Sequence, residues 1–85
     1  MNPEQRENIR RSVRQGARIV AVDGSALGAC MMVDVSATGA RLVLETSDLL
    51  PDRLFLLLSH NGNLRRLCSV VWQTGATAGI QFMFG

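Results

Sequence analysis

Two groups of polar residues have the types and the spacing needed to bind an anionic ligand. The first is the run Arg10-Arg11-Ser12-Val13-Arg14, in which Arg10 and Arg14 stand four residues apart. In a helix this spacing places the two side chains about 6 Å apart on one side, and in an extended chain about 13 Å apart on one face. Either arrangement lets two guanidinium groups donate paired hydrogen bonds to phosphate or guanine. The run alone is also typical of the solvated face of a short helix.

The second group lies between Asp34 and Leu42, where three residues follow the pattern Asp34-x-Ser36-x-x-Gly39. A carboxylate accepts both the N1 and N2 protons of guanine, and a serine hydroxyl adds a further hydrogen bond. Glycine permits a close approach that a Cβ would block. Asp and Ser also commonly bond the backbone of their own turn, so the segment alone is equally typical of a plain hairpin.

The length and composition of the chain indicate one small folded domain. Its 85 residues leave room for a single modest core. A content of 47% hydrophobic and 19% charged residues is typical of a globular protein and excludes a disordered one. No apolar run approaches the roughly 20 residues of a membrane-spanning helix, and no apolar stretch follows the N-terminal charges at signal-peptide distance. We therefore expect a cytoplasmic protein with no membrane insertion.

Positive charge is concentrated near the N-terminus. All nine basic residues are arginine, and five of them fall in the first eighteen positions, although the formal net charge is only +2. This distribution places a basic segment ahead of a nearly neutral body and predicts an anionic partner.

The remaining reactive side chains do not assemble into a metal site or a catalytic site. Cys30 and Cys68 each lie in an apolar run, where a free cysteine behaves as a small hydrophobe, so we expect reduced thiols in the core. His60 is the one histidine and no Cys-x-x-Cys pair occurs, which leaves no zinc ligand set. No activated nucleophile is evident, so we expect a protein that is not an enzyme and has no cofactor.

The body of the chain has the texture of short strands joined by tight turns. We predict strands at residues 17–22, 28–35, 39–45, 53–59, 64–73 and 78–84. Asn61-Gly62 is a strong hairpin signal, whereas Thr46–Asp52 is long enough to cross between sheet edges. The predicted fold is all-β, a six-stranded antiparallel split β-barrel over residues 17–85. A flexible or short-helical, arginine-rich N-terminal arm covers residues 1–16, with a helix start at Asn2-Pro3.

Alternation along two strands assigns their faces. Cys68, Val70 and Trp72 stand at every second position, so we place all three in the core. The segment Leu54–Leu58 is apolar on both faces. Its outer face therefore requires cover by the N-terminal arm or by a second subunit, which allows a homodimer.

Taken together and in this order, the motifs resemble those of a PilZ domain. The matching segments extend from about Arg10 to Phe84 and are Arg10-x-x-x-Arg14, Asp34-x-Ser36-x-x-Gly39, Val70-Val71-Trp72 and Gly79-Ile80-Gln81-Phe82. The resemblance implies a six-stranded antiparallel barrel that binds cyclic di-GMP. It assigns the phosphates and guanines to Arg10 and Arg14, with Arg11 beside them. It further implies that the ligand is held against the barrel by Asp34, Ser36 and Gly39.

The choice of arginine pair remains open on spacing alone. Arg6 with Arg10, and Arg14 with Arg18, also stand four residues apart. We select Arg10 and Arg14 from their distance to the first predicted strand.

The resemblance implies a receptor that changes conformation on nucleotide binding and passes the signal to a separate, unidentified downstream protein. One alternative is a PilZ-fold interaction module that binds no nucleotide and docks through Leu54–Leu58, although such relatives usually lack these motifs. Another is a barrel that binds single-stranded nucleic acid through exposed aromatic residues. The aromatic residues of this chain are predicted to be buried, so we expect no nucleic-acid polymer as partner.

Overall fold

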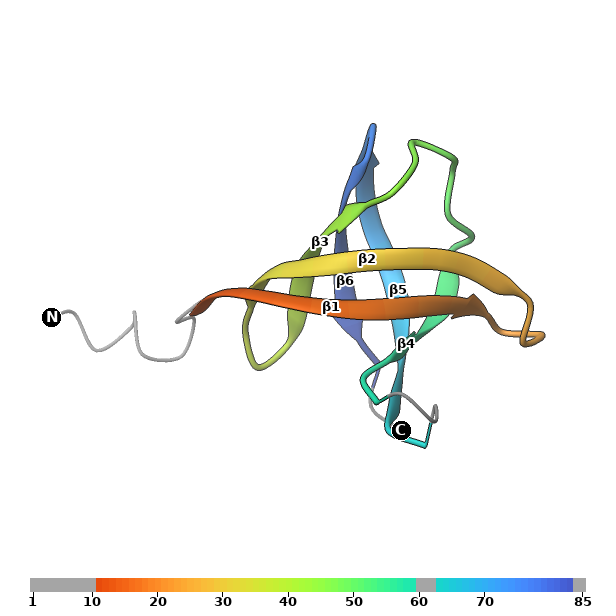
Figure 1. The fold of residues 1–85 in the computed structure, drawn as a ribbon, viewed down its shortest axis with the longest axis horizontal. Helices are drawn as coiled ribbons and strands as arrows, with labels where there is room; N and C mark the ends of the chain where they lie inside the picture. Colours follow the sequence, from red (N-terminus) through yellow and green to blue (C-terminus); the bar gives the residue numbers. More distant parts are fainter. Residues whose placement is uncertain (1–10, 60–62, 84–85) are drawn as a thin grey trace, which may run out of the picture.

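Six antiparallel strands make up the fold in the computed structural model, which describes residues 11–59 and 63–83. In chain order they are β1 (Arg11–Ala21), β2 (Ala26–Val35), β3 (Gly39–Leu44), β4 (Arg53–Leu57), β5 (Arg65–Thr74) and β6 (Thr77–Phe82). Figure 1 shows them wrapped into one closed barrel. The described residues include no helix long and apolar enough to cross a membrane. The predicted all-β, six-stranded antiparallel fold is confirmed.

The strands close in the order β1-β2-β3-β6-β5-β4, with β4 paired to β1. Consecutive strands pair directly, as predicted for β4 and β5, except that β3 and β4 are joined by a long link. This link includes Thr46–Asp52 and crosses the end of the barrel (Figure 1). Gln73 of β5 fastens it, because its side-chain oxygen accepts from the Leu50 N–H at 2.9 Å and its amide donates to the Asp48 carbonyl at 2.8 Å.

The barrel interior is filled by apolar side chains. The largest fully buried ones are Ile19, Leu42, Leu54, Leu56 and Cys68. Burying an aliphatic side chain stabilises the fold by about 1.5–3 kcal/mol relative to leaving it exposed. No polar or charged side chain among the described residues is buried. Apolar packing inside the closed barrel therefore holds the fold together, and the charged groups lie outside it.

Strand β1 begins at Arg11, whereas the sequence predicted a strand from about residue 17 and an arm before it. Its first residues pair with the far end of β2, Arg11 with Val35 and Ser12 with Asp34. Side chains in this part of β1 are mostly exposed, so polar residues are compatible with a strand there. Residues 1–10, which include the predicted helix start, lie outside the described residues.

The two faces of β4 differ as predicted for Leu54–Leu58. Leu54 and Leu56 are buried in the barrel, while Phe55 and Leu57 lie outward and are partly exposed. The guanidinium of Arg65 lies 4.9 Å from the centre of the Phe55 ring, which covers part of this face by a cation–π contact. The further cover by an arm or a second subunit stays a prediction.

Both cysteines are free and buried, and burial raises the pKa of the Cys30 and Cys68 thiols to about 11. A thiol with a raised pKa is almost fully protonated at neutral pH, and the protonated form is a poor nucleophile. We expect both thiols to react with a maleimide or a disulfide reagent many times more slowly in the folded protein than in urea. Rapid modification of either cysteine without denaturant would contradict their placement in the core.

Candidate functional site

The polar end of β2 faces outward because β2 has one extra residue relative to its neighbour β3. Ser12, Asp34 and Arg41 are paired across β1, β2 and β3, and the next paired set is Gln15, Met32 and Leu42. From one set to the other, β1 advances three residues, β2 two and β3 one. Paired residues must share a face, and side chains alternate along a regular strand, so β2 must break its alternation here. The break falls at Val33. Met32 consequently points into the core and Asp34 points out, with 20% of its side chain exposed.

A row of directly paired residues runs from Asp34 across the outside of the barrel. Asp34 of β2 pairs with Arg41 of β3, Arg41 with Gly79 of β6, and Gly79 with Trp72 of β5. Ser12 of β1 extends the row on the other side of Asp34. Five strands therefore contribute one residue each to a single outward row.

The placement of Trp72 corrects the prediction that it belongs to the core. Between Val70 and Trp72 strand β5 advances two residues while β6 advances one, so Val71 is an extra residue. This bulge reverses the alternation. Cys68 is buried as predicted and Val70 packs against the core, but the Trp72 side chain is 44% exposed on the outer surface.

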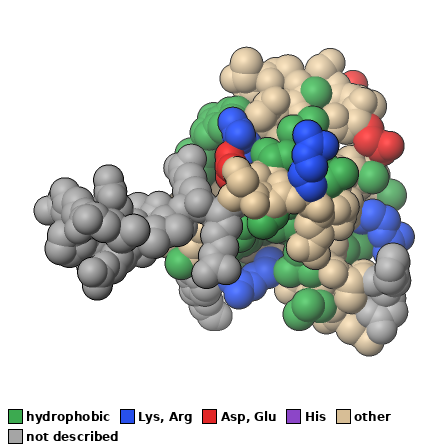
Figure 2. Space-filling view, turned by 60° about the vertical axis from the view of Figure 1, so that its left-hand side comes forward, with side chains coloured by type: hydrophobic (Ala, Val, Ile, Leu, Met, Phe, Trp, Pro, Cys, Tyr) green, Lys and Arg blue, Asp and Glu red, His purple; other side chains and the backbone are tan. Residues whose placement is uncertain are grey.

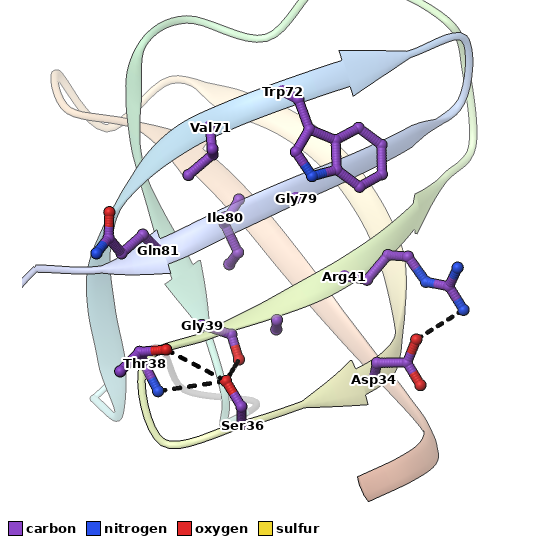
Figure 3. Close-up of a pocket in the computed structure, with 11 residues that line it drawn as sticks. Asp34, Ser36, Thr38, Gly39, Arg41, Val71, Trp72, Gly79, Ile80 and Gln81 are labelled. Atoms are coloured by element: carbon purple, nitrogen blue, oxygen red, sulfur yellow. Dashed lines mark hydrogen bonds and ion pairs between the residues drawn. The ribbon is translucent and has the colours of Figure 1, made fainter. Parts of the chain in front are cut away.

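The Trp72 indole lies against Gly79, its direct partner on β6 (Figure 3). A Cβ built on Gly79 would collide with Nε1 of that indole and lie 2.6 Å from its Cε2. The absence of a side chain at position 79 thus lets the ring rest on the strand. The ring retains an exposed surface suitable for stacking against a planar group.

Two hollows meet along the Asp34–Arg41 pair. The first, of about 300 Å³, is lined by Asp34, Ser36, Thr38, Gly39, Ala40, Arg41, Val71, Trp72, Gly79, Ile80 and Gln81. The second, of about 640 Å³, is lined by Ser12, Val13, Arg14, Val33, Asp34, Arg41, Val43 and Thr77. Of the described residues that line the two hollows, Asp34 is the one acidic residue, and Arg14 and Arg41 are basic.

Asp34 and Arg41 form an ion pair, with Arg41 Nη2 2.7 Å from Asp34 Oδ2 (Figure 3). The side chains are 20% and 48% exposed respectively. An ion pair between groups this accessible to water contributes only about 0–1 kcal/mol. The ion pair therefore orients the two side chains towards each other but is weak enough to break when another partner binds.

Ser36 is engaged in its own turn. Its hydroxyl accepts from the Thr38 N–H at 3.3 Å and donates to the Gly39 carbonyl at 3.4 Å, while the Ser36 N–H donates to the same carbonyl at 2.9 Å. A third contact joins the Ser36 and Thr38 hydroxyl oxygens at 3.4 Å. Good N–H···O bonds are about 2.9–3.0 Å long and good O–H···O bonds about 2.7–2.8 Å, so all three contacts of the Ser36 hydroxyl are weak. The hydroxyl is thus held beside the hollow without a strong competing bond.

Gly39 is required by the barrel itself. It has no positive φ, but a Cβ there would collide with the Ile80 carbonyl oxygen and lie 3.2 Å from the Gln81 Cα on β6. The close approach that the sequence assigned to this glycine is therefore an approach between neighbouring strands.

The predicted site residues that the structure describes lie on one surface, apart from the side chain of Arg11, which is not described. Asp34, Ser36 and Gly39 line the first hollow, and Arg14 lines the second beside Asp34. Arg11 begins β1, and Arg10 lies outside the described residues. Sequence reasoning missed Arg41 and Trp72. The only local signal for Arg41 was its position two residues after the motif glycine. No local sequence signal indicated the bulge at Val71, which turns Trp72 outward.

On the face shown in Figure 2, the arginine side chains lie singly among apolar and neutral surface, and they do not merge into a basic groove over the described residues. Those residues also contain no group of three His, Cys, Asp or Glu side chains able to hold a metal ion. The surface has instead the localised outward row, which includes the exposed Arg41 and the exposed Trp72 indole.

The chain is thus a small, closed antiparallel β-barrel whose outward row of acid, arginine and indole is a candidate ligand-binding surface. Comparison with protein-family models matches residues 4–85 to the PilZ domain. The chain therefore belongs to the PilZ domain family, whose domains are non-catalytic receptor domains. A comparison with curated proteins gives no match.

The collision at Gly39 predicts a stability effect that needs no ligand. Gly39→Ala should lower the free energy of unfolding by about 1–3 kcal/mol or more, because backbone atoms of β6 must move to admit the methyl group. Gly16→Ala on β1 is the matched control, since a Cβ at Gly16 meets nothing within 4 Å. Urea unfolding measures both. Equal stability of the two variants would refute the close approach of β3 and β6.

Displacement of the indole at Gly79 is readable from fluorescence, because Trp72 is the single tryptophan of the chain. Gly79→Ala should push the ring off β6 and into water, which shifts its emission to longer wavelength. Gly75→Ala is not a suitable control because Gly75 has a φ of 59°, so Gly16→Ala serves again. An unchanged spectrum for Gly79→Ala would show that the ring does not rest on this strand.

Proposed function

We propose that this protein is a cyclic di-GMP receptor that binds the nucleotide along the outward row and passes the signal to a separate protein. The observation that supports this most directly is the position of the Asp34 carboxylate, which is turned outward between a basic strand and an exposed indole. Membership of the PilZ family supports the same ligand. The receptor would act in the cytoplasm, where we expect the protein.

Each part of the row suits one part of the nucleotide. The Asp34 carboxylate accepts from guanine N1–H and N2–H, and the Ser36 hydroxyl adds a bond from the adjoining turn. The exposed face of Trp72 suits stacking by a base or contact with a ribose. Arg14 is exposed on β1 and lines the second hollow, where its guanidinium would bind a phosphate. Arg10 and Arg11 would add phosphate or guanine contacts from the same end of β1.

Charge in the two hollows favours an anionic ligand. Among the described residues that line them, Asp34 is paired with Arg41, and the positive charge of Arg14 has no acidic partner. A phosphate supplies the missing negative charge in a partly enclosed site, where pairing is stronger than on open surface.

The proposed switch follows from where the contacts originate. Asp34, Ser36 and Trp72 belong to the barrel, whereas Arg10 precedes its first strand. A nucleotide that bridges the two sets contacts both only when the N-terminal segment lies over the row, so binding shifts the population towards that state. The altered surface is then available to a downstream protein or to a second copy of the chain.

Calorimetry with cyclic di-GMP tests the proposal. We expect the wild type to bind, Trp72 fluorescence to change on titration, and Arg14→Ala to weaken binding by about 1.5–3 kcal/mol, as lost hydrogen bonds to charged groups do. The melting temperature of Arg14→Ala without nucleotide should equal that of the wild type.

Arg53→Ala is the matched control for Arg14→Ala, because Arg53 is exposed on β4, a strand that contributes no residue to either hollow. No heat of binding at tens of micromolar nucleotide would favour the interaction module that binds no nucleotide. Unchanged affinity of both Arg10→Ala and Arg14→Ala would show that the arginines are misassigned.

A further inference from the structure

Arg41 is paired with the Asp34 carboxylate, the group that binds guanine in the proposed function. Its Nη2 lies 2.7 Å from Asp34 Oδ2, and its Cα is the direct cross-strand partner of the Asp34 Cα. The two side chains point towards each other in Figure 3, away from the Ser36 turn. A guanine edge that uses both carboxylate oxygens therefore competes with the Arg41 guanidinium for Asp34 Oδ2.

The two competitors present similar chemistry to Asp34. A guanidinium offers planar N–H donors side by side, and the Watson–Crick edge of guanine offers N1–H beside N2–H in the same fashion. Asp34 thus already holds a group with the donor pattern of guanine. Replacing Arg41 by guanine at Asp34 costs little free energy, because both side chains of the ion pair are partly exposed. Breaking such a pair lowers the equilibrium constant for nucleotide binding by no more than about a factor of five.

The released guanidinium has a partner within reach. Guanine O6 is adjacent to N1 on the ring, and N7 follows it, so a base held by Asp34 through N1 and N2 presents two acceptors beside that carboxylate. Arg41 is the direct neighbour of Asp34 and lines the hollow on each side of it. Arginine is the side chain that most often donates to O6 and N7 together.

We propose that Arg41 is a specificity-determining residue that leaves Asp34 when the nucleotide binds and donates to O6 and N7 of the same guanine. This inference rests on the proposed function. Asp34 and Arg41 together recognise both the donors and the acceptors of guanine. Adenine opposes both contacts, because it has an amino group in place of O6 and an acceptor in place of N1–H.

The test measures affinity for three cyclic dinucleotides by calorimetry, with weak ligands measured by competition. Cyclic di-GMP has O6 and N2, cyclic di-IMP has O6 but no N2 amino group, and cyclic di-AMP has neither. We expect Arg41→Met to lower the affinity for cyclic di-GMP and cyclic di-IMP by the same factor, about tenfold or more. The affinity for cyclic di-AMP should fall much less, so selectivity for guanine over adenine decreases.

Two further variants separate recognition from charge. Arg41→Lys keeps the charge but loses the planar pair of donors, so it should recover part of the affinity and little of the selectivity. Arg53→Met removes a charge from β4, outside both hollows, and should leave the selectivity ratio unchanged.

Three results would overturn the assignment of Arg41 while leaving the proposed function intact. These are a rise in cyclic di-GMP affinity for Arg41→Met, unchanged affinity, or equal losses for cyclic di-GMP and cyclic di-AMP. A rise would mean that Arg41 only competes with the ligand, and equal losses would mean that it contributes only charge. Failure of the wild type to bind cyclic di-GMP would instead overturn the proposed function, and the assignment of Arg41 with it.

Discussion

The register of β2 and β5 determines which side chains this barrel presents on its outer surface. Each strand has one extra residue, Val33 in β2 and Val71 in β5, and each extra residue is followed by an outward polar or aromatic side chain. Without the break at Val33, Asp34 would fall on the same face as Met32, inside the barrel. An unpaired carboxylate there would cost several kcal/mol. The bulges therefore make the polar row compatible with an apolar interior.

Two glycines make that arrangement sterically possible. Gly39 lets β3 lie close to the backbone of β6, and Gly79 lets the Trp72 indole rest on β6. Both effects arise within the barrel and need no ligand. A motif glycine of a binding site is thus explained here by strand packing. Weaker nucleotide binding by a Gly39 variant would therefore indicate a lost contact only if the variant's free energy of unfolding were unchanged.

Much of the fold could be predicted from sequence because its signals are local. Alternation and turn residues predicted all six strands, and Asp34, Ser36 and Gly39 do line one hollow. The remaining features depend on pairing between distant segments. The start of β1 at Arg11 is set by its partner Val35, and the outward turn of Trp72 is set by its register with Gly79. Arg41 acquires its ion pair only through the register of β2 with β3.

The separation of core from site has a consequence for how a signal leaves the molecule. Among the described residues the interior contains no charged side chain, so an exchange of partners at Asp34 leaves the core packing unchanged. In the proposed switch, the rearrangement would be confined to the outer row and to the start of β1, which pairs with the β2 end that holds Asp34. A partner protein that responds to the nucleotide would therefore contact the surface near that junction, where the contacts of the two proposed states differ.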